Sequence, residues 1–133
     1  MSLEIISLNA NNIDQYGIGC IRDKKHPGVQ AKIKWAKLLF KDGLVIKLLM
    51  ENNKPIGFIE YIPGIHTWRP IQATGYFVIH CLWIYKTEHL NKGYASMLLQ
   101  DVIKDTVSRN RNGVVALASE GSWLASPKIF EKN

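Results

Sequence analysis

The stretch TGYFVIHCLWIYKTEHLNKGYASMLLQDVIKDTVS, residues 74–108, decides the fold that this sequence predicts. Its first part, 74–85, is rich in aromatic and β-branched side chains and predicts a long strand. After the polar loop 86–92, apolar residues recur at helical spacing over 94–108 and predict an amphipathic helix. The apolar run 114–118 then predicts a short buried strand. Together these segments predict a β-α-β unit.

Three further strands are predicted upstream of this unit. They cover residues 3–8, 44–51 and 56–62, and the turn NNKP joins the last two strands as a hairpin. The whole order of elements predicts an α/β fold with a mixed, mostly antiparallel central sheet and helices on both faces.

Helices are predicted between and after these strands. Asn and Asp residues can cap a short helix over 12–20. Apolar residues at helical spacing predict a second helix from Val29 to Phe40, with Gly43 as its C-terminal stop. The final segment, 122–133, predicts a last helix.

The length of 133 residues predicts a single domain, 1–133, with a substantial core. The sequence contains no run of 18 apolar residues, so no membrane span is predicted. The N-terminus lacks the layout of a signal peptide. Cys20 and Cys81 lie far apart in sequence, which argues against a disulfide framework and a zinc site. We therefore expect a cytoplasmic protein.

The net charge of +6 favours an anionic partner, such as nucleic acid, an anionic membrane surface or a phosphorylated cofactor. The lysines are not clustered like a nucleic-acid-binding arm. Four of them fall along one predicted helix, which we interpret as a solvated face: Lys32, Lys34, Lys37 and Lys41.

The string Asn91-Lys92-Gly93 lies where the polar loop turns into the long helix. Backbone N–H groups at a helix start have no partner within the helix, and the helix dipole adds positive charge there. A glycine lets the backbone approach a ligand closely, and Lys92 adds charge. These are the parts of a phosphate cradle, although a plain tight turn explains the same string.

The residues around this string resemble motif A of the GNAT N-acetyltransferase superfamily, [Gln/Arg]-x-x-Gly-x-[Gly/Ala]. The motif here is Leu90-Asn91-Lys92-Gly93-Tyr94-Ala95. The hairpin NNKPIGFIEYI resembles the preceding strand pair, and VVALASEGSWLASPKIFEKN resembles the following strand and helix. The strings CIRDKKHPG and HCLWI…EGSW are similar to a YoaP-like subgroup.

The resemblance implies that the chain binds acetyl-CoA as a co-substrate. The motif and the start of the helix would bind the pyrophosphate, and the end of the preceding strand would pair its backbone with the pantetheine arm. The implied cofactor-binding residues are Leu82, Trp83, Ile84, Leu90, Asn91, Lys92, Gly93, Tyr94, Ala95 and Ser96.

The chain departs from the motif pattern at three places. Leu90 stands where Gln or Arg is usual, and Phe130 stands where the superfamily often has a proton-donating tyrosine. The closing strands implied by the resemblance do not follow before Asn133, so we expect the C-terminal part of the fold to be incomplete.

Transfer of an acetyl group to an amine needs a general base, because an alkylammonium must lose a proton before it attacks. His80 and Glu60, on neighbouring predicted strands, are the candidate catalytic residues. The alternative interpretation of His80 is a partly buried strand histidine without a catalytic role. That of Glu60 is an exposed strand carboxylate. A Cys81–His80 pair is not expected, because successive strand residues point to opposite faces.

The implied function is N-acetyl transfer from acetyl-CoA to a primary amine, by direct attack in a ternary complex. The alternative is a weak or inactive acyl-CoA-binding domain, as a sensor or accessory module. The expected partner is a small-molecule or peptide amine, without nucleic acid or membrane, and a homodimer is compatible with an open sheet edge after residue 118.

Four further side chains have two alternative interpretations, as the lining of an acceptor pocket or as anchors of the core and loops: Tyr61, Trp68, Arg69 and Trp123. His26, His66 and His89 lack ligand spacing, so no metal is expected.

Overall fold

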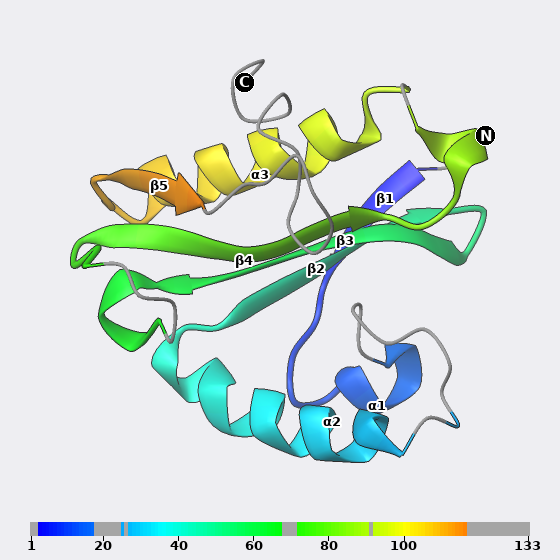
Figure 1. Ribbon diagram of the computed structural model, residues 1–133, viewed down its shortest axis with the longest axis horizontal. Helices are drawn as coiled ribbons and strands as arrows, with labels where there is room; N and C mark the ends of the chain where they lie inside the picture. Colours follow the sequence, from blue (N-terminus) through cyan, green and yellow to red (C-terminus); the bar gives the residue numbers. More distant parts are fainter. Residues whose placement is uncertain (1–2, 18–24, 26, 68–71, 91, 117–133) are drawn as a thin grey trace.

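Five strands form one sheet in the computed structural model, which describes residues 3–17, 25, 27–67, 72–90 and 92–116 (Figure 1). Their spatial order follows the sequence order. The first four strands are antiparallel to their neighbours, and the fifth is parallel to the fourth. The strands are β1 Leu3–Ser7, β2 Val45–Glu51, β3 Lys54–Pro63, β4 Tyr76–Ile84 and β5 Gly113–Ala116.

Helices cover both faces of this sheet (Figure 1). Helix α3 (Tyr94–Ser108) crosses one face and connects β4 to β5, whereas α1 (Ile13–Tyr16) and α2 (Gly28–Leu39) cover the other face. Three single-turn 3-10 helices lie in the connections: η1 Phe40–Asp42, η2 Gly64–His66 and η3 Thr87–His89. The predicted mixed, mostly antiparallel sheet with helices on both faces is therefore confirmed.

Each face of the sheet has its own apolar core. The α1–α2 side buries Leu8, Ile13, Val29, Ile33, Ala36, Leu44, Ile46, Leu48, Met50, Phe58 and Ile62. The α3 side buries Val45, Leu49, Ile56, Ile59, Tyr61, Phe77, Ile79, Ile84, Tyr94, Leu98, Leu99 and Val102. Residues of β2, and those of β3 from Phe58 to Ile62, alternate between the two lists, because successive strand side chains point to opposite faces.

Two local features explain how the chain turns where the sequence predicts it. Asn52 and Asn53, between β2 and β3, have φ angles of 53° and 67°. Two consecutive positive φ angles match the twist of a two-residue hairpin, and asparagine tolerates them better than most residues. After η1, Gly43 has a φ of 92° and ends the helical segment, as predicted.

The predicted boundaries agree best where the periodicity is longest. Helix α3 has the predicted bounds. The described part of the first helix, α1, is shorter than the predicted range 12–20, because Gly17 (φ 79°) takes the chain out of the helix. The predicted helix 122–133 and the residues Trp68, Arg69, Asn91, Trp123 and Phe130 lie outside the described residues. Of the helices that the structure describes, none is long and apolar enough to cross a membrane.

Candidate active site

A β-bulge in β4 shapes the surroundings of His80. Glu60 of β3 pairs with Cys81, whereas the next β3 residue, Tyr61, pairs with Ile79, so His80 is one extra residue in β4. Such a bulge interrupts the usual alternation of side chains. His80 lies beside Glu60, and Cys81 packs against the α1–α2 core, so both residues face the same side of the sheet. The expectation that His80 and Cys81 point to opposite faces is therefore wrong.

Glu60 and His80 lie together, buried under the α2 side of the sheet. Their exposed fractions are 3% and 4%. The Nδ1 atom of His80 is 3.7 Å from Oε2 of Glu60, and His80 Nε2 shares a hydrogen bond of 2.7 Å with Thr67 Oγ1. The alternative interpretation of Glu60 as an exposed strand carboxylate is therefore wrong. The structure brings both candidate catalytic residues into one polar contact.

A lysine of α2 completes this group. The Lys32 Nζ atom is 3.5 Å from Glu60 Oε1 and 3.7 Å from the centroid of the Trp35 ring. The sequence did not predict this contact, because Lys32 was interpreted as part of a solvated face. That interpretation is confirmed for Lys34 and Lys41, which are exposed, while Lys37 pairs with Asp14 at 2.8 Å. We call Lys32, Glu60, Thr67 and His80 the Glu60 cluster.

The start of α3 has the geometry that an anion requires. Gly93 caps the helix in the left-handed conformation (φ 80°, ψ 9°), and neither a side-chain cap nor an acidic residue occurs in the first turn. A Cβ added to Gly93 would meet nothing within 4 Å, and Lys92 beside it is exposed. Open space, a positive helix end and a lysine suit a phosphate group.

The other predicted cofactor-binding residues surround this helix start. Leu82, Trp83 and Ile84 form the last part of β4, and within the described residues β5 pairs with β4 only from Tyr76 to Ile79. Trp83 and Leu90 are exposed, whereas Ile84 and Tyr94 are buried, and Leu82, Ala95 and Ser96 are half-buried. The Tyr94 hydroxyl donates a hydrogen bond of 2.9 Å to Glu51 Oε2, which raises the pKa of Tyr94.

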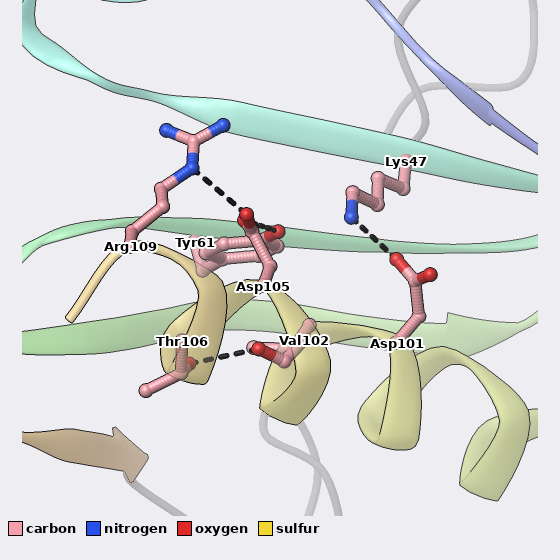
Figure 2. Close-up of polar contacts among 7 residues, drawn as sticks. All are labelled: Lys47, Tyr61, Asp101, Val102, Asp105, Thr106 and Arg109. Atoms are coloured by element: carbon pink, nitrogen blue, oxygen red, sulfur yellow. Dashed lines mark hydrogen bonds and ion pairs between the residues drawn. The ribbon is translucent and has the colours of Figure 1, made fainter. Parts of the chain in front are cut away.

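Polar contacts hold α3 on the sheet (Figure 2). They lie on the face opposite α2 and the Glu60 cluster (Figure 1). Lys47 of β2 pairs with Asp101, and the Tyr61 hydroxyl donates a hydrogen bond of 2.5 Å to Asp105. Asp105 also accepts a hydrogen bond of 2.8 Å from Arg109 Nε. Burial, together with this carboxylate, raises the pKa of Tyr61 far above its ordinary value. Tyr61 is therefore a core anchor of α3, and its alternative prediction as an acceptor-pocket residue is wrong.

The described residues contain no group of three or more His, Cys, Asp and Glu side chains arranged to hold a metal ion. His66 is exposed on η2, and His89 lies 3.7 Å from Glu51.

Solved acetyltransferase structures share this architecture. An aminoglycoside acetyltransferase, AAC(6')-Iy, bound to a bisubstrate analogue of CoA, aligns with a TM-score of 0.71 and 13% identity, over 99% of this chain and 86% of its own. A predicted acetyltransferase from Clostridium acetobutylicum, solved with acetyl-CoA, aligns with a TM-score of 0.68 and 17% identity, over 98% and 88%. The chain therefore has the fold of the GNAT acetyltransferases.

A sequence relative is the uncharacterized N-acetyltransferase YoaP of Bacillus subtilis (strain 168), with 32% identity over 130 residues. The alignment covers 95% of this chain, and the chain spans about half the length of that relative (51%). No protein-family model matches the chain. The predicted resemblance to the GNAT N-acetyltransferases is thus confirmed, and the chain is a relative of YoaP.

Proposed function

We propose that the chain is an N-acetyltransferase, which transfers an acetyl group from acetyl-CoA to a primary amine by direct attack in a ternary complex. The observation that carries this proposal is the β4–α3 unit. One end of the unit offers an open, positive helix start at Gly93, and its strand holds His80 against the buried Glu60. The relationship to YoaP, named as an N-acetyltransferase, supports the same assignment.

The start of α3 is the proposed site for the pyrophosphate of acetyl-CoA. The backbone N–H groups from Asn91 to Ser96 would contact it, and Lys92 would add positive charge beside it. The backbone of Leu82, Trp83 and Ile84 would pair with the pantetheine arm, as a strand pairs with an extended peptide. A backbone N–H in the same part of β4 would polarise the thioester oxygen. When bound, acetyl-CoA supplies an activated acetyl group.

The Glu60 cluster is the proposed base for the acceptor amine. An alkylammonium has a pKa of about 10, so a base must take its proton before nitrogen can attack. His80 is the side chain best suited to proton transfer near neutral pH. The Thr67 hydrogen bond to Nε2 fixes the orientation of the His80 ring, and Glu60 lies beside the other ring nitrogen. Glu60 can thus stabilise positive charge on His80, or accept the proton itself.

The proposed acceptor is a small molecule or peptide with a primary amine. The solved structures of the same fold include proteins named as aminoglycoside acetyltransferases and a ribosomal-protein-alanine N-acetyltransferase. A first panel of acceptors therefore contains aminoglycosides, polyamines, amino acids and lysine peptides.

Calorimetric titration of acetyl-CoA tests the cofactor site with two variants of one position, Gly93→Gln and Gly93→Glu. Both variants place a side chain of similar size at a left-handed φ, so they share the backbone strain. They differ in charge. We expect the wild type to bind acetyl-CoA, and Glu to weaken binding much more than Gln. Failure of the wild type to bind, or equal effects of the two variants, would contradict the proposed pyrophosphate site.

Release of free CoA across the amine panel then separates turnover from binding. The alternative, an acyl-CoA-binding domain without turnover, is favoured by Phe130, where the superfamily often has a proton-donating tyrosine. That alternative predicts acetyl-CoA binding without amine-dependent CoA release.

A further inference from the structure

The Glu60 cluster already contains a primary amine, which belongs to the protein. We propose that Lys32 is an acetyl acceptor, so that the protein acetylates its own Lys32 from acetyl-CoA. This inference rests on the proposed function, because it uses the same base and the same co-substrate. It assigns a modification site on α2 in addition to the external amine.

The surroundings of Lys32 Nζ are those of a binding site for an alkylammonium group. The nitrogen is 3.5 Å from Glu60 Oε1 and 3.7 Å from the centroid of the Trp35 ring. A carboxylate and an aromatic face are the two groups that attract a primary ammonium in a partly desolvated place. Lys32 Nζ therefore lies beside the proposed base, where the ammonium group of an external acceptor would have to bind.

Burial distinguishes this ion pair from an ordinary surface pair. The side chain of Glu60 is 4% exposed and that of Lys32 is 24% exposed. A surface ion pair is surrounded by water. Lys32 instead has a buried carboxylate as the nearby proton acceptor, and that carboxylate lies beside His80. A neighbouring carboxylate favours the charged form of an ammonium group at rest. The Glu60 cluster would therefore have to take the proton of Lys32 before its nitrogen attacks, as it would for an external amine.

The strand register places Glu60, the partner of Lys32, next to the strand segment of the proposed thioester position. Glu60 pairs with Cys81, the residue directly before the segment 82–84 that we propose to align the acetyl-CoA arm. A lysine side chain has a flexible four-carbon stem, so its nitrogen can move over the strand after it loses its proton.

The transfer step is balanced without a further reactant. Neutral Lys32 Nζ forms a bond to the acetyl carbonyl carbon, and the carbon–sulfur bond of the thioester breaks. The proton of the ammonium passes to Glu60 or His80, the second N–H proton is lost as the amide forms, and one proton ends on the CoA thiolate. The products are acetyl-lysine at position 32, CoA with a free thiol and one proton released to solvent. The modification removes the positive charge beside Glu60.

Lys37 is a matched internal control for this reaction. It lies on the same helix and also pairs with a carboxylate, Asp14, at 2.8 Å. That pair lies at the surface, with side chains 38% and 60% exposed. Uncatalysed acetylation by acetyl-CoA depends on exposure, so it would modify Lys37 and the exposed Lys34 faster than Lys32. Acetylation by the Glu60 cluster gives the opposite order.

The test is peptide mass spectrometry of the full chain incubated with isotope-labelled acetyl-CoA, with the label followed over time at Lys32, Lys34 and Lys37. We expect Lys32 to be modified at least about tenfold faster than Lys37, at a rate constant independent of protein concentration. In Glu60→Gln, the Lys32 rate should fall by about a hundredfold, the lower range for a lost general base. The Lys37 rate should stay unchanged in that variant.

Calorimetric titration of acetyl-CoA on the same samples separates the two proposals. If acetyl-CoA binds and Lys32 is modified no faster than Lys37, self-acetylation is overturned and the proposed function stands. If Lys32 is modified selectively at the same rate in Glu60→Gln, the Glu60 cluster is not its base and the inference is likewise overturned. Absence of acetyl-CoA binding in the wild type overturns both proposals.

Discussion

The Tyr94 hydroxyl donates a hydrogen bond of 2.9 Å to Glu51 Oε2, which joins the first residue of α3 to the last residue of β2. His89 Nε2, in the loop before α3, lies 3.7 Å from the other Glu51 oxygen. One carboxylate at the hairpin end of the sheet therefore contacts both the loop and the helix start on either side of Gly93. This arrangement orients the proposed pyrophosphate site relative to β4.

The first prediction concerns this contact. We expect Tyr94→Phe to weaken acetyl-CoA binding several-fold, because the helix start loses its hydrogen bond to β2 while the backbone N–H groups remain. Calorimetric titration measures the effect, with circular dichroism to check the helix content. Tyr76→Phe is the matched control, since Tyr76 is an exposed residue at the other end of β4. Equal affinities for wild type and Tyr94→Phe would show that Glu51 does not orient the site.

The second prediction concerns Tyr61, whose pKa is raised first by burial and then by the hydrogen bond to Asp105. Below an ordinary tyrosine pKa of about 10, the hydroxyl is protonated in both states and its contribution to stability is complete. Above that pH the unfolded state releases the proton while the folded state retains it, so the free energy of unfolding falls as pH rises.

Urea denaturation at about pH 8 and about pH 11, on either side of the ordinary tyrosine pKa, measures this effect. At the lower pH, Tyr61→Phe should lose about 1.5–3 kcal/mol, the value of a hydrogen bond to a charged group. Between the two pH values, the variant should lose less stability than the wild type. Lysines titrate in the same range, so the comparison with Tyr61→Phe is essential. Equal pH-dependent losses in both proteins would exclude a proton held by Tyr61.

Local signals in the sequence were sufficient to predict most of the fold. The long apolar periodicity from Tyr94 to Ser108 predicted α3 with its bounds, because a glycine precedes it and a polar turn follows it. The hairpin at Asn52 and Asn53 could be predicted because few residues tolerate two successive positive φ angles. Each of these signals lies within a short stretch of chain.

The geometry of the Glu60 cluster could not be predicted in the same way. The bulge at His80 leaves the apolar pattern of β4 continuous, so alternation placed Cys81 on the wrong face. The contact of Lys32 with Glu60 depends on how α2 packs across the sheet, and four lysines on one helix do not reveal which one faces inward. Residue types predicted the candidates, whereas tertiary packing determined their partners.

The third prediction concerns Gly57 of β3, which allows β4 to approach closely. A Cβ at Gly57 would lie 2.6 Å from Ile84 Cδ1 and 2.8 Å from the Trp83 carbonyl oxygen. The backbone oxygen cannot move without displacing the end of β4. Gly57→Ala should therefore lower the free energy of unfolding by about 1–3 kcal/mol, as other overpacked sites do.

Because the strain falls on Trp83 and Ile84, acetyl-CoA affinity should fall in the same Gly57→Ala variant. The control for stability, not for affinity, is Gly93→Ala, whose Cβ meets no atom within 4 Å and which carries only the cost of its positive φ, about 1–2 kcal/mol. Urea denaturation compares the two variants. A Gly57→Ala protein as stable as the wild type would mean that β3 and β4 separate easily at this point.

The last prediction concerns catalysis by the Glu60 cluster. With the best acceptor of the amine panel, Glu60→Gln and His80→Gln should each lower kcat by a factor of about 10² to 10⁴, the range for loss of a general acid or base. Both substitutions replace an ionisable group with a neutral amide. Acetyl-CoA affinity should be unchanged, since neither side chain belongs to the proposed cofactor site.

His66→Gln is the matched control, because His66 is an exposed histidine on η2, close in sequence to Thr67. It should retain the wild-type kcat. The ratio between the effects on kcat and on acetyl-CoA affinity decides the role of the Glu60 cluster. If kcat and affinity fall together in Glu60→Gln, the buried carboxylate supports the structure of β3 and β4, and the base must be sought elsewhere. If kcat falls and acetyl-CoA affinity stays unchanged, proton removal from the acceptor depends on Glu60, which contacts both His80 in the β4 bulge and Lys32 of α2.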